Sequence, residues 1–126
     1  RDSRTEEGLK TALKLLKDIR KEFETNLFIP GSTEGVNIEL EKALRLNDFI
    51  TMGELIAYDA LNRNESCGGH FREEYQTEEG EAKRDDENYF YVSCWEYQGS
   101  DDVAPVLYKE PLVYEAIKVQ TRNYKS

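Results

Sequence analysis

The sequence predicts a mainly α-helical protein, with a three-helix antiparallel bundle over residues 1–66 and a small β-rich C-terminal segment over residues 67–126. Two observations give this prediction. Apolar residues recur every three or four positions up to residue 61, which is the period of amphipathic helices. Beyond residue 70 that period ends, and aromatic and β-branched residues gather in short runs, as is typical of strands.

The first helix is predicted over residues 5–24. Ser3 and Glu6 have the spacing of a capping box, in which a hydroxyl and a carboxylate satisfy free N–H groups of the first turn. Behind them, apolar residues follow at three- and four-residue steps, with lysines on the opposite side. The apolar stripe consists of Leu9, Ala12, Leu13, Leu16, Ile19 and Phe23.

Two more helices are predicted after the breaker Pro30-Gly31-Ser32. Asn47-Asp48 separates them, because these side chains favour helix N-caps over helix interiors. Gly53 costs the third helix roughly 1 kcal/mol of propensity, so we expect a close helix–helix contact there. Ser66, Gly68 and Gly69 are expected to end the third helix, since glycine accepts a left-handed cap. The apolar residues are Val36, Leu40, Ala43 and Leu44 in the second helix, and Phe49, Met52, Ile56, Ala57, Ala60 and Leu61 in the third.

The C-terminal segment is predicted to contain short antiparallel strands. Residues 89–97 form the first strand, a turn follows at residues 98–102, and its partners are residues 106–108 and 112–120. Because both faces of the first strand carry large side chains, we expect either burial on both sides or one face against another domain. The two faces consist of Phe90, Val92 and Cys94 on one side, and Tyr89, Tyr91, Ser93, Trp95 and Tyr97 on the other.

The charge of the chain excludes one class of partner. Its formal net charge is −9, whereas nucleic-acid binding needs a basic surface. Residues 65–87 hold nine acidic and three basic side chains. We interpret this stretch as a solvated acidic loop, since like charges repel and stay exposed. A docking patch or cation site is the alternative, but the spacing of EF-hand ligands is absent.

The cysteine and histidine content predicts no metal centre. Cys67 and Cys94 are expected to be reduced thiols of a cytosolic protein, and Cys94 to have a structural role. Two distant cysteines and a single histidine do not supply the four ligands of a zinc site. Cys67 lies near Arg63, His70 and Arg72 in the sequence, and its role is left open. No apolar run reaches the ~18 residues of a membrane-spanning helix.

The most specific motif is Arg63-Asn64-Glu65-Ser66-Cys67-Gly68-Gly69-His70, followed by the acidic run Arg84-Asp85-Asp86-Glu87-Asn88. It resembles the signature R-x-E-S-R-G-A-H, with a later R-D-D-E-N, of the flavoprotein subunit of succinate dehydrogenase and fumarate reductase. The sequence departs from that signature at Cys67 and Gly69. Comparable residues at Thr5–Leu9 and Arg122–Tyr124 extend the resemblance over nearly the whole chain. It covers the helical domain and the C-terminal segment of such a subunit.

The resemblance implies that the chemistry lies elsewhere in a longer polypeptide. In that family the FAD fingerprint, the flavin-linking histidine and the substrate-binding residues belong to segments that would precede Arg1. We therefore expect no catalytic, cofactor-binding or metal-binding residue in this chain, and FAD only in the parent subunit. The candidate site is a set of interdomain contacts, with His70 interpreted as structural rather than as a group that protonates near neutral pH. The candidates are Arg63, Glu65, His70, Arg72 and Arg84.

The function that the resemblance implies is structural. The chain would be the C-terminal domain of a respiratory subunit that interconverts succinate and fumarate and passes electrons from FAD to an iron–sulfur subunit. Its partners would be the upstream FAD-binding and capping domains, the iron–sulfur subunit and a membrane anchor, on the inner, cytoplasmic face of the cell membrane. The alternatives are the equivalent domain of L-aspartate oxidase, which has a similar signature, and a free-standing acidic interaction module.

Overall fold

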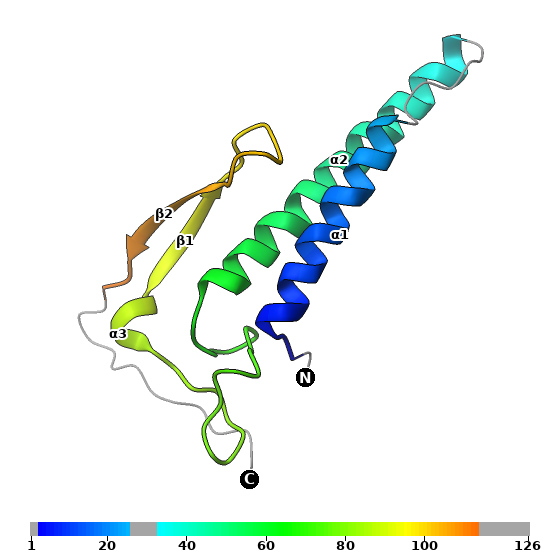
Figure 1. The fold of residues 1–126 in the computed structure, drawn as a ribbon. Helices are drawn as coiled ribbons and strands as arrows, with labels where there is room; N and C mark the ends of the chain where they lie inside the picture. The colour runs from blue at the N-terminus through cyan, green and yellow to red at the C-terminus, as the bar shows by residue number, and fades with distance from the viewer. Residues whose placement is uncertain (1–2, 26–32, 114–126) are drawn as a thin grey trace.

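The computed structural model describes residues 3–25 and 33–113 and is mainly helical. Two long helices run side by side in opposite directions, and a pair of antiparallel strands lies beside the second of them (Figure 1). A connection of irregular structure joins the helical hairpin to the strands. The elements are α1 (Glu6–Thr25), α2 (Thr33–Asn62), α3 (Asp86–Tyr89), β1 (Tyr91–Glu96) and β2 (Val106–Pro111).

The three-helix bundle is not confirmed, because α2 runs without a break through the boundary predicted at Asn47-Asp48. The side chain of Asn47 does not cap a new helix there. Its Oδ1 accepts a hydrogen bond from Arg20 Nε of α1 at 3.0 Å. No glycine or proline interrupts the backbone at this point, so the two predicted helices are one element. The described residues therefore form a helical hairpin rather than a bundle of three.

The start of α1 and the end of α2 differ in detail from the predicted caps. At the start of α1, Thr5 rather than Ser3 is the capping residue, since Thr5 Oγ1 accepts the N–H of Gly8 at 3.0 Å. Glu6 N–H donates instead to Glu74 Oε1, at 2.5 Å, from the acidic connection. A carboxylate beside a helix N-terminus is stabilising because the helix dipole is positive there.

The C-terminus of α2 lies at Asn62, before the predicted stop at Ser66, Gly68 and Gly69. Gly68 has a φ of +59°, but it lies in a tight turn between Cys67 and His70 and not in a helix cap.

The core lies between the two helices. Leu9 and Leu13 of α1 are buried against Ala57 and Ala60 of α2, and burial of each leucine contributes roughly 1.5–3 kcal/mol. Gly53 lies at the predicted close contact, since a Cβ at this position would be 3.4 Å from Leu16 Cδ1. Small residues on α2 thus let α1 approach, which gives the hairpin a thin core.

The strands agree with the prediction in position and differ in length. β1 begins at Tyr91, because residues 86–89 form the short helix α3, whose first turn is capped by Asp85. β2 extends to Pro111, beyond the predicted residue 108, and pairs with β1 in antiparallel register, Cys94 opposite Tyr108. Most of the predicted third strand over residues 112–120 lies outside the described residues. The division of the chain at residue 66 into two domains stays a prediction.

The aromatic face of β1 packs on α2. Trp95 Nε1 donates to Asp59 Oδ1 at 2.9 Å, and the Trp95 ring lies 6.2 Å from that of Tyr58. Val92 and Cys94 on the opposite face are exposed in this chain. One face of the strand is therefore covered by its own chain and the other is not.

Candidate functional site at the helix junction

Four of the five predicted site residues gather where α2 ends and the connection to the strands begins. Glu65 and Arg72 are fully buried together with Ser66, although two of the three are charged. A buried charge is costly unless its hydrogen bonds are satisfied. The local contacts of this junction therefore decide what these residues do.

Arg72 closes the C-terminal end of α2. Its Nη1 donates to the carbonyl of Leu61 at 3.0 Å and to Asn64 Oδ1 at 3.2 Å. The last carbonyls of a helix lack partners within the helix and carry its negative dipole, so a guanidinium here supplies both hydrogen bonds and charge. Its Nε lies 3.5 Å from Glu74 Oε2, an ion pair without hydrogen-bond geometry.

The backbone of the same segment clamps the start of α1. Arg4 N–H donates to the Phe71 carbonyl at 3.1 Å, and Glu73 N–H donates to the Arg4 carbonyl at 2.8 Å. Within the same segment, Ser66 Oγ accepts a hydrogen bond from the backbone N–H of Arg72 at 2.9 Å. The connection therefore ties the end of α2 to the beginning of α1.

Arg63 and Glu65 link the helix end to α3. Arg63 Nε and Nη2 donate to Glu65 Oε1, at 2.9 and 2.5 Å, and Nη2 also donates to the Tyr89 carbonyl at 3.1 Å. Glu65 Oε2 accepts the N–H of Asp85 at 3.3 Å. The buried carboxylate is thus neutralised by one arginine and fixed to the residue that caps α3.

His70 is held by the backbone. Its Nε2 lies 3.2 Å from the carbonyl of Arg63, which can only accept, so Nε2 carries the proton of that hydrogen bond. Burial lowers the pKa of His70 below 6.5, and the positive charges of Arg63 and Arg4 lower it further. The ring is therefore neutral near pH 7, with Nδ1 left as an acceptor.

Arg84 is not part of this cluster. Its guanidinium forms a bidentate pair with the carboxylate of Asp86, two residues along the chain, at 2.8 Å to each oxygen. Whether any of the five residues contacts another domain stays a prediction.

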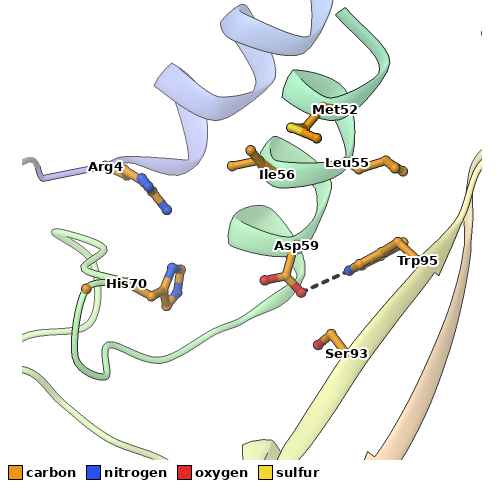
Figure 2. Close-up of a pocket in the computed structure, with 9 residues that line it drawn as sticks. Arg4, Met52, Leu55, Ile56, Asp59, His70, Ser93 and Trp95 are labelled. Atoms are coloured by element: carbon orange, nitrogen blue, oxygen red, sulfur yellow. Dashed lines mark hydrogen bonds between the residues drawn. The ribbon is translucent and has the colours of Figure 1, made fainter. Parts of the chain in front are cut away.

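A cavity of about 410 Å³ opens beside His70, between α2, the Cys67–His70 turn and β1. Figure 2 shows the side chains of Arg4, His70 and Asp59 around this space, with Met52 and Ile56 on the wall formed by α2. Among the described residues, Ser93 Oγ at its edge is buried without a hydrogen-bond partner. The complete lining is Arg4, Met52, Leu55, Ile56, Asp59, Gly69, His70, Ser93 and Trp95.

A second buried cluster, centred on Arg20 of α1, is missed by the sequence motifs. Arg20 Nη1 donates to Glu54 Oε1 at 2.7 Å and also bonds Asp101 of the loop after β1, while Nη2 donates to Thr51 Oγ1 at 2.7 Å. Helical spacing contains a signal for it, because Arg20 continues the apolar series of Leu9, Leu13 and Leu16. A charge on a buried stripe requires a partner.

The Gly68-Gly69 turn does not have the placement of a dinucleotide phosphate site. The Gly68-Gly69 turn follows a helix C-terminus, whereas a dinucleotide phosphate needs a turn that leads into a helix N-terminus. No group of three or more potential ligand side chains converges among the residues described. Cys67 is half-buried and Cys94 is exposed, both as free thiols. None of the described helices is long and apolar enough to cross a membrane.

Comparison with known proteins places the chain within a flavoprotein. The model of the family described as "Fumarate reductase flavoprotein C-term" matches residues 3–124. An uncharacterized FAD-dependent oxidoreductase of Methanocaldococcus jannaschii is 32% identical over 72 residues. That similarity covers 57% of this chain but only 12% of the relative, so the chain corresponds to a small part of that protein. No solved structure matches the chain.

Proposed function

The chain belongs to the family of fumarate reductase flavoprotein C-terminal domains, and from that premise we propose that it is the structural C-terminal domain of a subunit that interconverts succinate and fumarate. In this proposal FAD and the reacting atoms are held by other parts of the parent polypeptide. The chain itself supplies a rigid element that packs against them.

The observation that carries the proposal is the family match, which extends over residues 3–124 and so over nearly the whole chain. The site geometry supports it. The charged residues of the signature are engaged in internal contacts, with Arg72 on the carbonyl of Leu61 and Glu65 on Arg63. Catalytic groups are instead arranged to meet substrate, often with the pKa tuned to the proton transfer. His70 faces the Arg63 carbonyl with a lowered pKa, which suits a neutral positioning residue.

The junction explains what such a domain contributes. It fixes the end of α2 to the start of α1 and to α3 through buried hydrogen bonds, so the helical hairpin and the strands keep one relative orientation. Most buried polar groups of this network are hydrogen-bonded, with Arg72 Nε as an exception, and such networks rigidify a structure. A rigid domain keeps its docking face in a fixed position, which is what a structural support for a redox body requires.

The proposed partners follow from the same family membership. Upstream FAD-binding and capping domains would contact the chain within one polypeptide. An iron–sulfur subunit and a membrane anchor would receive the electrons, with the assembly peripheral on the cytoplasmic face of the cell membrane.

The experiment compares the parent polypeptide with the isolated chain. We expect the parent to copurify with FAD, to reduce an artificial electron acceptor with succinate and to show no turnover with L-aspartate. The isolated chain, incubated with FAD, should retain no flavin after gel filtration and should show no turnover. Turnover by the isolated chain would contradict the structural assignment, and turnover of the parent with L-aspartate alone would favour the aspartate oxidase reading.

A further inference from the structure

The β1–β2 loop, residues 97–105, is attached to the helices through one side chain of α1. Figure 1 shows this loop at the end of the strand pair that lies farthest from α3. In the described part of the chain, the polar and ring contacts of the loop with the two long helices converge on Arg20. Arg20 Nη1 donates a hydrogen bond to Asp101, and the guanidinium carbon lies 5.6 Å from the ring centre of Tyr97. The state of the Arg20 contacts therefore decides whether the loop stays attached.

The same nitrogen of Arg20 also binds a carboxyl group of α2. Nη1 donates to Glu54 Oε1 at 2.7 Å as well as to Asp101 Oδ1. Because both oxygens contact one nitrogen atom, the carboxyl groups of Glu54 and Asp101 are immediate neighbours. The side chains of Arg20, Glu54 and Asp101 are 4%, 5% and 15% exposed. Water therefore screens little of the repulsion between two carboxylates at this position.

The charges of this cluster do not balance when both carboxyl groups are ionised. One guanidinium then faces two carboxylates, which leaves one excess negative charge in a buried space. Such a charge is costly, and of two adjacent carboxyl groups one retains its proton more readily. Tyr97, which also contacts Arg20, is uncharged near neutral pH because burial raises its pKa above 10. One proton on the carboxyl pair is what makes the cluster neutral.

The surroundings of Glu54 favour a proton on this pair. Burial raises the pKa of Glu54 above 4.5, and Asp101 raises it further through its charge and through a hydrogen bond between the two carboxyl groups. Arg20 opposes this rise without reversing it. Two ionised carboxylates can only accept hydrogen bonds, so a hydrogen bond between them requires that one carries a proton.

The two carboxyl groups differ in how easily they can reach water. Glu54 lies inside the long helix α2, whose backbone hydrogen bonds hold it in place. Asp101 lies on the loop, two residues after Gly99, which has a φ of +82°, and its side chain is the more exposed of the two. An excess negative charge is therefore relieved by hydration of Asp101 rather than of Glu54.

We propose that Glu54 and Asp101 form a proton-binding carboxyl pair, and that loss of its single proton releases the β1–β2 loop from Arg20. The closed cluster contains the guanidinium, one carboxylate and one carboxylic acid. When the proton passes to water, Glu54 keeps its ion pair with Arg20, and the ionised Asp101 moves into solvent with its loop. The pair belongs to this chain and does not depend on the reaction that the parent subunit catalyses.

Hydrogen exchange of the full-length flavoprotein subunit tests the pair, with mass spectrometry of the peptide that contains residues 97–105. The exchange rate of the urea-unfolded subunit is divided by that of the native subunit at the same pH, which gives a protection factor for the loop. Because the closed state binds the proton more tightly than the released state, the protection factor should fall as the pH rises above 4.5. Release coupled to one proton sets the steepest fall at about tenfold per pH unit.

Two variants of the full-length subunit remove the pair and keep the size of the side chain. In Glu54→Gln and in Asp101→Asn, Arg20 faces a single carboxylate, so the cluster is neutral without an added proton. We expect the protection factor of the loop to be independent of pH in both variants. Glu41→Gln is the matched control, because Glu41 is an exposed carboxylate on the same helix, and it should keep the fall seen in the wild type.

The proposal is overturned if protection of the loop in the wild type does not change with pH. It is also overturned if Glu54→Gln lowers the protection equally at every pH and keeps the slope of the wild type, since the cluster would then be purely structural. If Glu54→Gln does not fold, Asp101→Asn decides the result, because Asp101 lies on a loop. A slope that persists in Asp101→Asn would assign the titration to another group and overturn the proposal.

Discussion

Arg20 and Arg72 are both buried arginines in a chain of net charge −9, yet they are neutralised in different ways. Arg20 lies between two carboxylates, those of Glu54 and Asp101, in the middle of the helical hairpin. Arg72 lies at a helix end, where its main partners are a backbone carbonyl and an amide oxygen. Removal of Arg20 would leave buried negative charge, whereas removal of Arg72 would leave unpaired dipoles and the partly exposed carboxylate of Glu74.

The two centres also hold different parts together. The Arg20 centre fixes the loop after β1 to the helices through Asp101. The Arg72 centre fixes the connection to the end of α2. The stability lost when a buried arginine is removed therefore depends on the partner groups that are left buried and unpaired. Buried carboxylates without a partner cost more free energy than a backbone carbonyl or an amide oxygen without one.

The largest expected effect is that of Arg20→Met. Breaking a buried ion pair from one side costs roughly 3–5 kcal/mol, because the remaining carboxylates of Glu54 and Asp101 stay desolvated. Urea unfolding of the chain, followed by circular dichroism, measures the loss. Lys21→Met, at an exposed neighbour, is the matched control and should change the free energy of unfolding by less than ~0.5 kcal/mol. Equal losses in the two variants would refute the importance of the buried cluster.

A smaller effect is expected from Arg72→Met. It leaves the Leu61 carbonyl and Asn64 Oδ1 without this donor, a loss of about 1–3 kcal/mol in the free energy of unfolding. Arg72→Lys should recover part of the loss, because it keeps a positive charge at the helix C-terminus. The same urea titration compares the variants. A loss as large as that of Arg20→Met would remove the distinction between the two centres.

The smallest expected effect is a pH dependence that has opposite signs in the two regions. Burial lowers the pKa of His70 below 6.5, so between that lowered pKa and 6.5 the unfolded state binds more protons and stability falls as the pH falls. Burial raises the pKa of Glu54 above 4.5, with the nearby Asp101 adding to the rise. In the window above 4.5 the folded state therefore binds more protons, and stability falls as the pH rises.

Thermal unfolding at a series of pH values separates these contributions. His70→Gln should remove the loss of stability just below pH 6.5, and Glu54→Gln should remove only the one just above pH 4.5. If His70→Gln leaves the profile of the wild type unchanged, His70 does not titrate as its burial requires.

Some of this structure could be predicted because the signal is local. The apolar series of α1 predicts its span to within a residue or two, and the aromatic run predicts β1, with Trp95 on the face opposite Val92 and Cys94. The boundary at Asn47-Asp48 failed because the partner of Asn47 is Arg20, which is 27 residues away. The signature motif contains Arg63, Glu65 and His70, and Arg72 follows it two residues later, but their role as interdomain contacts stays a prediction. No sequence motif predicts the buried Arg20 cluster or the cavity. Arg84 was predicted as an interdomain contact, and its guanidinium pairs with the nearby carboxylate of Asp86.

The sequence by itself determined the periodic elements, the family signature and the acidic character of the chain, because these depend on neighbouring residues and on composition. Only the tertiary structure decided that α2 is one continuous helix, that two arginines are buried, and that Phe49, Met52 and Ile56 lie open beside the cavity. The physical reason is that burial and hydrogen-bond pairing depend on groups brought together from distant positions. The free energy of a charge or an apolar side chain is set by those surroundings rather than by its place in the sequence.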